Sequence, residues 1–417
     1  MKSTRTRLVL GLLLALAASP ALATDGYFQL GYGTPYVGMA GAGVALSLNT
    51  MAPATNPAAD AWVTGYDLNA GFFNPNREFT VTGTPSGFPG TFGLQPGTVK
   101  SGTSLFVVPG IGANWKLGDT ATLGLVIYGN GGMNTTYAES VFFAGRTGVD
   151  LSQLFIAPTF TYKVSNEHAF GISPIICYQR FQAEGLGSFA PFSSDASNLS
   201  NRGHDESLGY GARIGYLGKL TPWLSVGGAY QTKVSMGRFK NYAGLFAEQG
   251  GFDIPSNWTV GVAVKPADAV TLAFDVQRIY YSKIESIGNP LLPNLQTARL
   301  GDDGGAGFGW QDVTAYKAGL QWAASPALTL RAGYAYAKQP IPSSEVLFNI
   351  LAPGVIEQHL TVGASANVGT KSKVHLSIVR ALSKSVTGPN PLEVPGKQTI
   401  ELKMDQWLFD LGLSYGF

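Results

Sequence analysis

Residues 402–417, LKMDQWLFDLGLSYGF, decide the fold class. Every second side chain at the end of this run is apolar, and the other face carries Gln406, Asp410, Gly412, Ser414 and Gly416. Successive side chains of a strand point to opposite faces, so this alternation predicts a strand with one apolar face. The apolar face comprises Trp407, Phe409, Leu411, Leu413, Tyr415 and Phe417.

The same alternation recurs in residues 224–231, 270–277 and 360–367, while the overall composition is unusual for a soluble protein. Charged residues make up 13% of the chain, against about 25% in typical globular proteins. Beyond the N-terminal leader, no run of 18 apolar residues is present that would form a membrane-spanning helix. A transmembrane β-barrel needs no such run, because each strand exposes only one face to lipid. We therefore expect an all-β, antiparallel outer-membrane barrel.

The connections between the expected strands alternate between short and long. The short turns are expected at 117–120, 165–168, 220–222, 266–268, 324–327 and 369–372. The long loops are expected near 83–101, 135–149, 185–206, 241–253, 288–311, 338–356 and 386–401. Outer-membrane barrels have short periplasmic turns and long extracellular loops. Six turns and seven loops make thirteen connections, which predicts about fourteen strands.

The first 23 residues have the pattern of a secretory signal peptide. Basic Lys2, Arg5 and Arg7 precede a short apolar run, 8–18, and an A-x-A site places cleavage after Ala23. Removal of these three cations leaves 25 basic against 26 acidic side chains, so nothing indicates a nucleic-acid partner. Cys177 is the only cysteine, which excludes an intramolecular disulfide.

Residues 24–65 are expected to form a hatch inside a barrel of residues 66–417. About fourteen strands enclose a lumen that is too wide for their own side chains to fill. The segment 24–65 is rich in Gly and Ala, nearly uncharged, and lacks sustained alternation. The alternative is a disordered periplasmic tail, but low charge and many aromatic residues are atypical of disorder.

Several stretches resemble the FadL/TodX family of outer-membrane channels. They are GMAGAGVAL (38–46), ATNPAAD (54–60), FFNPNREFTVTG (72–83), GLVIYGNGG (124–132), GFGWQDVTAYKAGLQW (307–322) and the C-terminal strand. The resemblance implies a fourteen-stranded barrel with an N-terminal hatch, in which Asn56, Pro57 and Ala58 form a hatch motif. It also implies passive uptake of long-chain fatty acids or hydrocarbons by a monomer surrounded by outer-membrane lipid. Termination on Phe417 resembles the signature read by the outer-membrane assembly machinery.

The family resemblance further implies that ligand leaves sideways at a kink in the third strand. Gly129, Asn130, Gly131 and Gly132 occupy that stretch. Glycine inside a strand is typical of a bulge, because it tolerates backbone angles that other residues avoid. The alternative is a strand that ends in its loop at this point.

The long loops carry apolar residues that we interpret as a binding surface for a hydrophobic ligand. Leu347 and Phe348 lie in one expected loop, and Leu245 and Phe246 lie in another. Exposed apolar patches of this size usually mark an interaction site. The alternative is that the loops pack on one another over the barrel mouth, and both interpretations are compatible.

Strand parity places few charges in the expected lumen, which argues against a general diffusion porin. The inward-facing charges are expected to be Arg213, Lys233, Asp275, Lys317, Arg331 and Asp410. Lys317 and Arg331 lie on consecutive strands and are candidates to hold a fatty-acid carboxylate. The alternative role for this pair is a lumenal ion pair or a contact with the hatch.

The sequence gives little support for catalysis, metals or cofactors. His375 and Ser377 share one strand face, which leaves a lipid-modifying enzyme as a remote alternative, but no third residue completes a triad. The four histidines have no metal-ligand spacing, and no cofactor motif is present. We therefore expect a passive channel for hydrophobic molecules, with a general porin as the main alternative.

Overall fold

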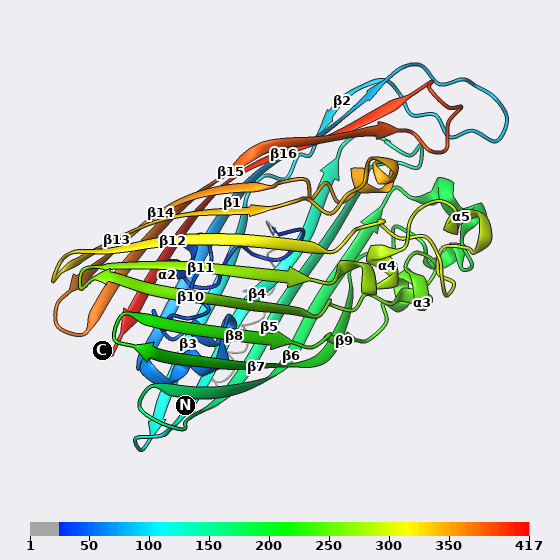
Figure 1. Ribbon diagram of the computed structural model, residues 1–417. Helices are drawn as coiled ribbons and strands as arrows, with labels where there is room; N and C mark the ends of the chain where they lie inside the picture. Colours follow the sequence, from blue (N-terminus) through cyan, green and yellow to red (C-terminus); the bar gives the residue numbers. More distant parts are fainter. Residues whose placement is uncertain (1–24, 417) are drawn as a thin grey trace, which may run out of the picture.

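The computed structural model describes residues 25–416, so the expected signal peptide and Phe417 lie outside the described residues. Antiparallel strands form one sheet that closes on itself because the first strand pairs with the last. Fourteen strands make the barrel wall, as predicted (Figure 1). They are β1 (Gly65–Thr82), β3 (Phe106–Leu117), β4 (Ala121–Tyr137), β5 (Thr147–Lys163), β6 (His168–Glu184), β7 (Asp205–Thr221), β8 (Leu224–Gln231), β10 (Asn257–Ala267), β11 (Val270–Ile279), β12 (Val313–Ser325), β13 (Leu328–Ala337), β14 (Gln358–Val368), β15 (Ser372–Pro389) and β16 (Thr399–Tyr415).

Two short strands lie in the long loops: β2 (Gly97–Lys100) pairs with β1, and β9 (Ser235–Met236) pairs with β7. All six predicted short turns are confirmed, and they gather at one end of the barrel. The long loops gather at the other end, where Figure 1 shows α3 (Ala247–Gly250), α4 (Glu285–Gly288) and α5 (Asn294–Thr297). Six short 3-10 helices also lie in these loops: η3 (Gly187–Phe192), η4 (Ala196–Asn198), η5 (Lys240–Tyr242), η6 (Tyr281–Lys283), η7 (Ser343–Glu345) and η8 (Phe348–Ile350). Within residues 25–416, no helix is long and apolar enough to span a membrane.

The outward face of the barrel carries the apolar residues that the alternation predicted. On β16, the side chains of Trp407, Phe409, Leu411, Leu413 and Tyr415 are all exposed. Toward the loops the outward residues of the same strand become polar, beginning with Asp405, which pairs in register with Asn76 of β1. This change marks the outer edge of the apolar band, since charged side chains avoid the hydrocarbon layer.

The N-terminal segment, residues 25–64, lies inside the barrel and is drawn in dark blue in Figure 1. It contains α2 (Thr34–Val37), η1 (Ala52–Ala54) and η2 (Pro57–Trp62). Buried polar groups need hydrogen-bond partners, and inward carboxylates of the wall supply them to this irregular backbone. Asp275 of β11 accepts hydrogen bonds from the backbone N–H groups of Gly43 and Val44, at 2.7 and 2.8 Å.

Further contacts tie the N-terminal segment to other sides of the wall. Asp67 of β1 accepts a hydrogen bond from the backbone N–H of Thr50 at 2.8 Å, and the Thr34 hydroxyl donates to Asp410 of β16. These anchors come from strands around the barrel, so the segment is held across the lumen. One expected inward charge was wrong: Lys233 lies beyond the end of β8, is half exposed, and contacts Asp253 at 2.5 Å.

Candidate functional site

An apolar hollow, the outer chamber, lies among the long loops and has an empty volume of about 500 Å³. Three of the predicted ligand-binding residues, Leu245, Phe246 and Phe348, line it. Leu347 is buried in the same apolar cluster but does not line the hollow. The remaining lining side chains are mostly aromatic and aliphatic, among them Phe142, Phe181, Phe189, Phe308 and Leu351.

Aromatic contacts between two loops, and between a loop and β6, hold the walls of the outer chamber together. The ring centroids of Phe181 and Phe246 lie 4.6 Å apart, and those of Phe189 and Phe348 lie 5.3 Å apart in an edge-to-face arrangement. Such pairs stabilise a packed cluster beyond their buried area. The loops therefore pack on one another, as one interpretation of the sequence stated, and they enclose a cavity in doing so.

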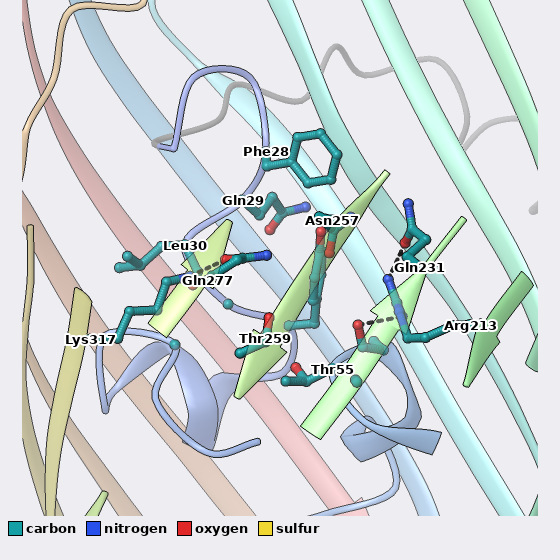
Figure 2. A pocket seen from close by; sticks show the side chains of 15 residues that line it. Phe28, Gln29, Leu30, Thr55, Arg213, Gln231, Asn257, Thr259, Gln277 and Lys317 are labelled. Atoms are coloured by element: carbon teal, nitrogen blue, oxygen red, sulfur yellow. Dashed lines mark hydrogen bonds between the residues drawn. The ribbon is translucent and has the colours of Figure 1, made fainter. Parts of the chain in front are cut away.

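A second hollow, the inner chamber, lies between the N-terminal segment and the wall formed by β7, β8, β10, β11 and β12. Its empty volume is about 480 Å³. Figure 2 shows polar side chains of neighbouring strands around it, facing residues 28–30 of the N-terminal segment. These wall residues are Arg213, Gln231, Asn257, Thr259, Gln277 and Lys317.

Lys317 lines the inner chamber but is engaged by the N-terminal segment. Its Nζ atom lies 2.9 Å from the Asp25 carboxylate, 2.8 Å from the Leu30 carbonyl oxygen and 2.9 Å from the side-chain oxygen of Gln277. The contacts to Leu30 and Gln277 are hydrogen bonds, and the contact to Asp25 is an ion pair. Lys317 therefore fixes the start of the N-terminal segment to β12.

Arg331 lies near the short-turn end of β13 and does not line either chamber. Its Nε atom donates to the Gln321 side chain at 2.9 Å, and a terminal nitrogen donates to the Ser365 hydroxyl at 2.5 Å. In the β12–β13 ladder Lys317 pairs with Ala335, whereas Arg331 pairs with Gln321, four residues away. The structure thus does not bring Lys317 and Arg331 together around one cavity.

Arg213 is the uncompensated charge of the inner chamber. It is buried and forms no ion pair within residues 25–416. It donates to the Ala54 carbonyl at 2.5 Å, to the Tyr128 hydroxyl at 2.9 Å and to the side-chain oxygen of Gln231. The amide nitrogens of Gln231 and Asn257 are buried without a partner. Unpaired buried donors beside a cation suit a ligand that carries an acceptor oxygen.

The sequence analysis gave Arg213 no binding role, although strand parity already placed it inward, and it did not single out Gln231. Asn257 is the first residue of β10, and it was not singled out either. Parity indicates only the direction of a side chain. The partners of these three residues lie in the N-terminal segment or on other strands, so no local signal reveals which donors remain unpaired.

Asn56, Pro57 and Ala58 lie at the start of η2 and are buried. The Asn56 side chain accepts a hydrogen bond from the Ala58 backbone N–H at 3.0 Å, which caps the helix. Its amide nitrogen donates to the carbonyl oxygens of Val44 at 2.7 Å and of Tyr216 on β7 at 2.9 Å. The motif therefore caps the start of η2, binds the loop at Val44 and fixes η2 and this loop to β7.

The predicted glycine stretch lies within β4, which continues past it to Tyr137, so the strand does not end there. The register of the β4–β5 ladder shifts between Gly129 and Gly131, which leaves Asn130 as the extra residue. The Asn130 amide donates to the Gln153 side chain at 3.0 Å. Gly131 is needed because a Cβ atom there would lie 1.9 Å from the Tyr27 carbonyl oxygen. The following residue, Gly132, donates its N–H to the same oxygen at 3.2 Å.

His375 and Ser377 do not form a nucleophile–base pair. The two ring nitrogens of His375 contact the hydroxyls of Ser365 and Ser414 at 2.6 and 2.7 Å. The Ser377 hydroxyl donates to the Thr34 carbonyl oxygen at 2.7 Å. Both residues support the packing of β14–β16 and the N-terminal segment. Within the described chain, no cluster of three or more His, Cys, Asp or Glu side chains is arranged for a metal ion.

Comparison with known proteins agrees with this architecture. The fold is similar to that of the Pseudomonas putida toluene transporter TodX, with a TM-score of 0.67 and 18% identity over 93% of this chain and 99% of that one. A Pseudomonas aeruginosa FadL homologue gives a TM-score of 0.68 and 15% identity, covering 94% and 99% of the two chains. The Ralstonia pickettii toluene transporter TbuX gives 0.62 and 17%, covering 93% and 99%. No curated protein sequence matches the chain.

Residues 15–417 match the family described as outer membrane protein transport protein (OMPP1/FadL/TodX). The match spans almost the whole chain and includes every strand of the barrel. Members of this family are transport proteins of the outer membrane and not enzymes, which agrees with the structural roles of His375 and Ser377. The chain therefore belongs to the OMPP1/FadL/TodX family of outer-membrane transport proteins.

Proposed function

We propose that this protein is a passive channel through which hydrophobic small molecules, long-chain fatty acids or hydrocarbons, cross the outer membrane. The observation that carries the proposal is the outer chamber, an apolar cavity built from six aromatic side chains and their aliphatic neighbours at the extracellular end of the barrel. An apolar solute gains about 0.8 kcal/mol for each CH₂ group that it buries. The toluene transporters and the FadL homologue with the same fold support this ligand class.

The N-terminal segment acts in this proposal as the hatch that blocks free diffusion along the barrel axis. A general porin needs a continuous water-filled path. Here Asp275 holds the segment to β11, and Asp67 and Asp410 hold it to the neighbouring strands β1 and β16. This arrangement supports a plugged, selective channel over a porin.

Ligand release in this proposal is sideways, through the wall beside the β4 bulge. Two observations support this route. The bulge lies against the tip of the N-terminal segment at Tyr27, and a hollow of about 300 Å³ lies behind it. The ligand then enters the surrounding outer-membrane lipid without passing the hatch. The channel works as a monomer, since entry, chambers and exit all belong to one chain.

Uptake in bacterial cells that lack their own channel of this kind tests the proposal. Radiolabelled oleate and toluene are supplied separately, and uptake of at least one should rise when the protein is expressed. Phe246→Ala should reduce that uptake, whereas replacement of exposed Phe88 by Ala should not. Uptake of neither compound, together with steady ion conductance in planar bilayers, would show that the protein is a porin.

A further inference from the structure

The barrel wall contains a gap between the loop-side halves of β1 and β4, because β3 is too short to reach between them. β3 pairs with β1 only as far as Phe73 and with β4 only as far as Tyr128. Beyond these points β4 continues for nine residues, 129–137, and pairs only with β5. The corresponding half of β1 pairs with β16 and, near its end, with β2.

Residues 101–104, which we name the crossing segment, close this gap without forming a strand. Ser101 donates its backbone N–H to the Arg77 carbonyl of β1 at 2.9 Å, and Gly102 donates to the Thr136 carbonyl of β4 at 2.7 Å. The hydroxyls of Thr103 and Thr136 lie 3.1 Å apart. A few separate hydrogen bonds thus replace the continuous ladder found elsewhere in the wall.

Arg77 spans the gap on the inner side of the crossing segment. Its two terminal nitrogens donate to the carbonyl oxygens of Asn134 on β4 and Thr103 in the crossing segment. Its Nε atom is buried without a partner, and the guanidinium forms no ion pair in the described part of the chain. The side chain is 3% exposed. A guanidinium binds a carboxylate more strongly than two neutral carbonyls, because two parallel N–H groups then donate to one charged acceptor.

Behind Arg77 lies the hollow of about 300 Å³, which we name the side hollow. Met133, Met404 and Trp310 give it an apolar lining next to the guanidinium. It adjoins the outer chamber along the chain, since Phe308 and Leu351 line the outer chamber while the nearby Trp310 and Ala352 line the side hollow. Residues of the same two loops thus line both cavities, and in this inference the ligand passes from the outer chamber to the side hollow.

The gap lies at the outer edge of the apolar band. Asn74, the first polar outward residue of β1, donates its side-chain amide to the Ser104 carbonyl of the crossing segment at 3.0 Å. An amphiphile that leaves at this height places its acyl chain in the hydrocarbon layer and its head group among the lipid head groups. A cation at this level, such as Arg77, therefore contacts the head group of the amphiphile and not its acyl chain.

We propose that Arg77 binds the carboxylate of an amphiphilic ligand and that this exchange opens the side exit. The ligand carboxylate replaces the carbonyls of Asn134 and Thr103 on the guanidinium. This exchange removes the Arg77 bridge between the crossing segment and β4 and leaves the hydrogen bonds to Thr136, which separate when the exit opens. A neutral hydrocarbon has no group to make this exchange. The inference rests on sideways release as proposed above and assigns the carboxylate class of ligand to this exit.

Replacement of Arg77 tests the carboxylate part. Uptake of oleate is measured against uptake of oleyl alcohol, its neutral counterpart, for Arg77→Leu and for Arg77→Lys. The oleate-to-alcohol ratio should fall on the order of tenfold in Arg77→Leu, the effect of one charge-assisted contact, and less in Arg77→Lys. Arg380→Leu is the matched control, because Arg380 points outward and binds Asp405 at 2.6 Å. An unchanged ratio in a correctly assembled Arg77→Leu barrel would overturn the proposal.

A reversible crosslink tests the opening independently and does not require that Arg77 variants fold. In a Cys177→Ala background, the pair Thr103→Cys and Thr136→Cys joins the crossing segment to β4. Oxidation should stop oleate uptake, and reduction should restore it. The control pair, Thr80→Cys and Thr98→Cys, starts from hydroxyls 2.8 Å apart and ties β2 to β1 without crossing the gap, so it should have no effect.

The outcomes separate this inference from the proposed function. If oleate uptake continues when the 103–136 crosslink is oxidised, the channel works without opening of the gap. That result overturns the inference and leaves the proposed function unchanged. Toluene uptake without oleate uptake in the wild-type protein also overturns the inference alone. Absence of oleate, oleyl alcohol and toluene uptake overturns both the channel function and the inference.

Discussion

Asp275→Ala should detach part of the N-terminal segment and make the channel conduct ions. In the native structure the buried Asp275 carboxylate accepts two backbone hydrogen bonds, from Gly43 at 2.7 Å and from Val44 at 2.8 Å. Alanine leaves both N–H groups without an acceptor in the lumen. A hydrogen bond to a charged group contributes about 1.5–3 kcal/mol.

We expect a loss at the lower end, about 3 kcal/mol for the two bonds together, because the substitution also removes the cost of burying the carboxylate. That loss shifts the equilibrium between docked and undocked segment by roughly a hundredfold. The bond of Asn56 to the Val44 carbonyl remains and limits the movement to the neighbouring loop.

Single-channel recording in planar bilayers measures the effect. The wild-type protein should be nearly silent, whereas Asp275→Ala should show frequent openings. Asp119→Ala, in an exposed turn, is the control that should behave like the wild type. A silent Asp275→Ala channel with normal barrel assembly would refute the reasoning that this carboxylate holds the hatch.

Three further predictions concern other contacts of the same path. Gly131→Ala should displace the tip of the N-terminal segment and change ligand uptake, because the new Cβ atom meets the Tyr27 carbonyl at 1.9 Å. The control Gly228→Ala, whose new Cβ atom has its closest contact at 3.7 Å, should leave ligand uptake unchanged. Phe246→Ala should weaken ligand capture and raise the half-saturating concentration for uptake about tenfold, the effect of losing one aromatic contact. Burial raises the pKa of Asp60 to about 7, although a hydrogen bond from Asn114 opposes the shift. The urea concentration at the unfolding midpoint should therefore fall as the pH rises from about 4 to about 7. Asp60→Asn should remove the part of this pH dependence that comes from Asp60.

The direction of the pH effect follows from proton binding. The native state keeps the Asp60 proton up to about pH 7, whereas an unfolded aspartate loses it near pH 4. Between these values the native state binds more protons, so its stability decreases as the pH rises and is constant above pH 7 as far as Asp60 is concerned. The urea midpoint of the wild-type protein and that of Asp60→Asn are compared across this range. If both midpoints rise equally with pH, the pH dependence does not come from a raised pKa of Asp60.

The barrel could be predicted from the sequence because its wall is built from local patterns. Alternation with a period of two indicates which side chains of a strand face outward. This prediction is confirmed for β16, where the side chains from Trp407 to Tyr415 on the apolar face are exposed. Turn composition located all six periplasmic connections. The shortness of β3 was not predicted, because the neighbours that residues 101–104 contact lie far away in the chain, at Arg77 and Thr136.

The site was predicted in part for the same reason. Leu245, Phe246 and Phe348 were recognised because several apolar residues in an extracellular loop are unusual. The role of Lys317 depends on Asp25, 292 residues earlier in the chain, and Arg77 depends on Asn134, 57 residues later. Such partners are set by the closure of the barrel and the fold of its loops, which no local period encodes.

The distribution of buried charge along the path argues for an amphiphilic ligand. Lys317 is neutralised by Asp25, but Arg213 in the inner chamber and Arg77 at the side exit have no carboxylate partner among residues 25–416. Burying an unpaired cation is costly, and a pure hydrocarbon would recover none of that cost. A fatty acid would, since its chain is apolar like the lining of the outer chamber and its carboxylate can pair with a guanidinium. We therefore expect oleate to be taken up in preference to toluene, and Arg77→Leu to reduce that preference while Lys317→Gln, which loosens the N-terminal segment, changes the uptake of both.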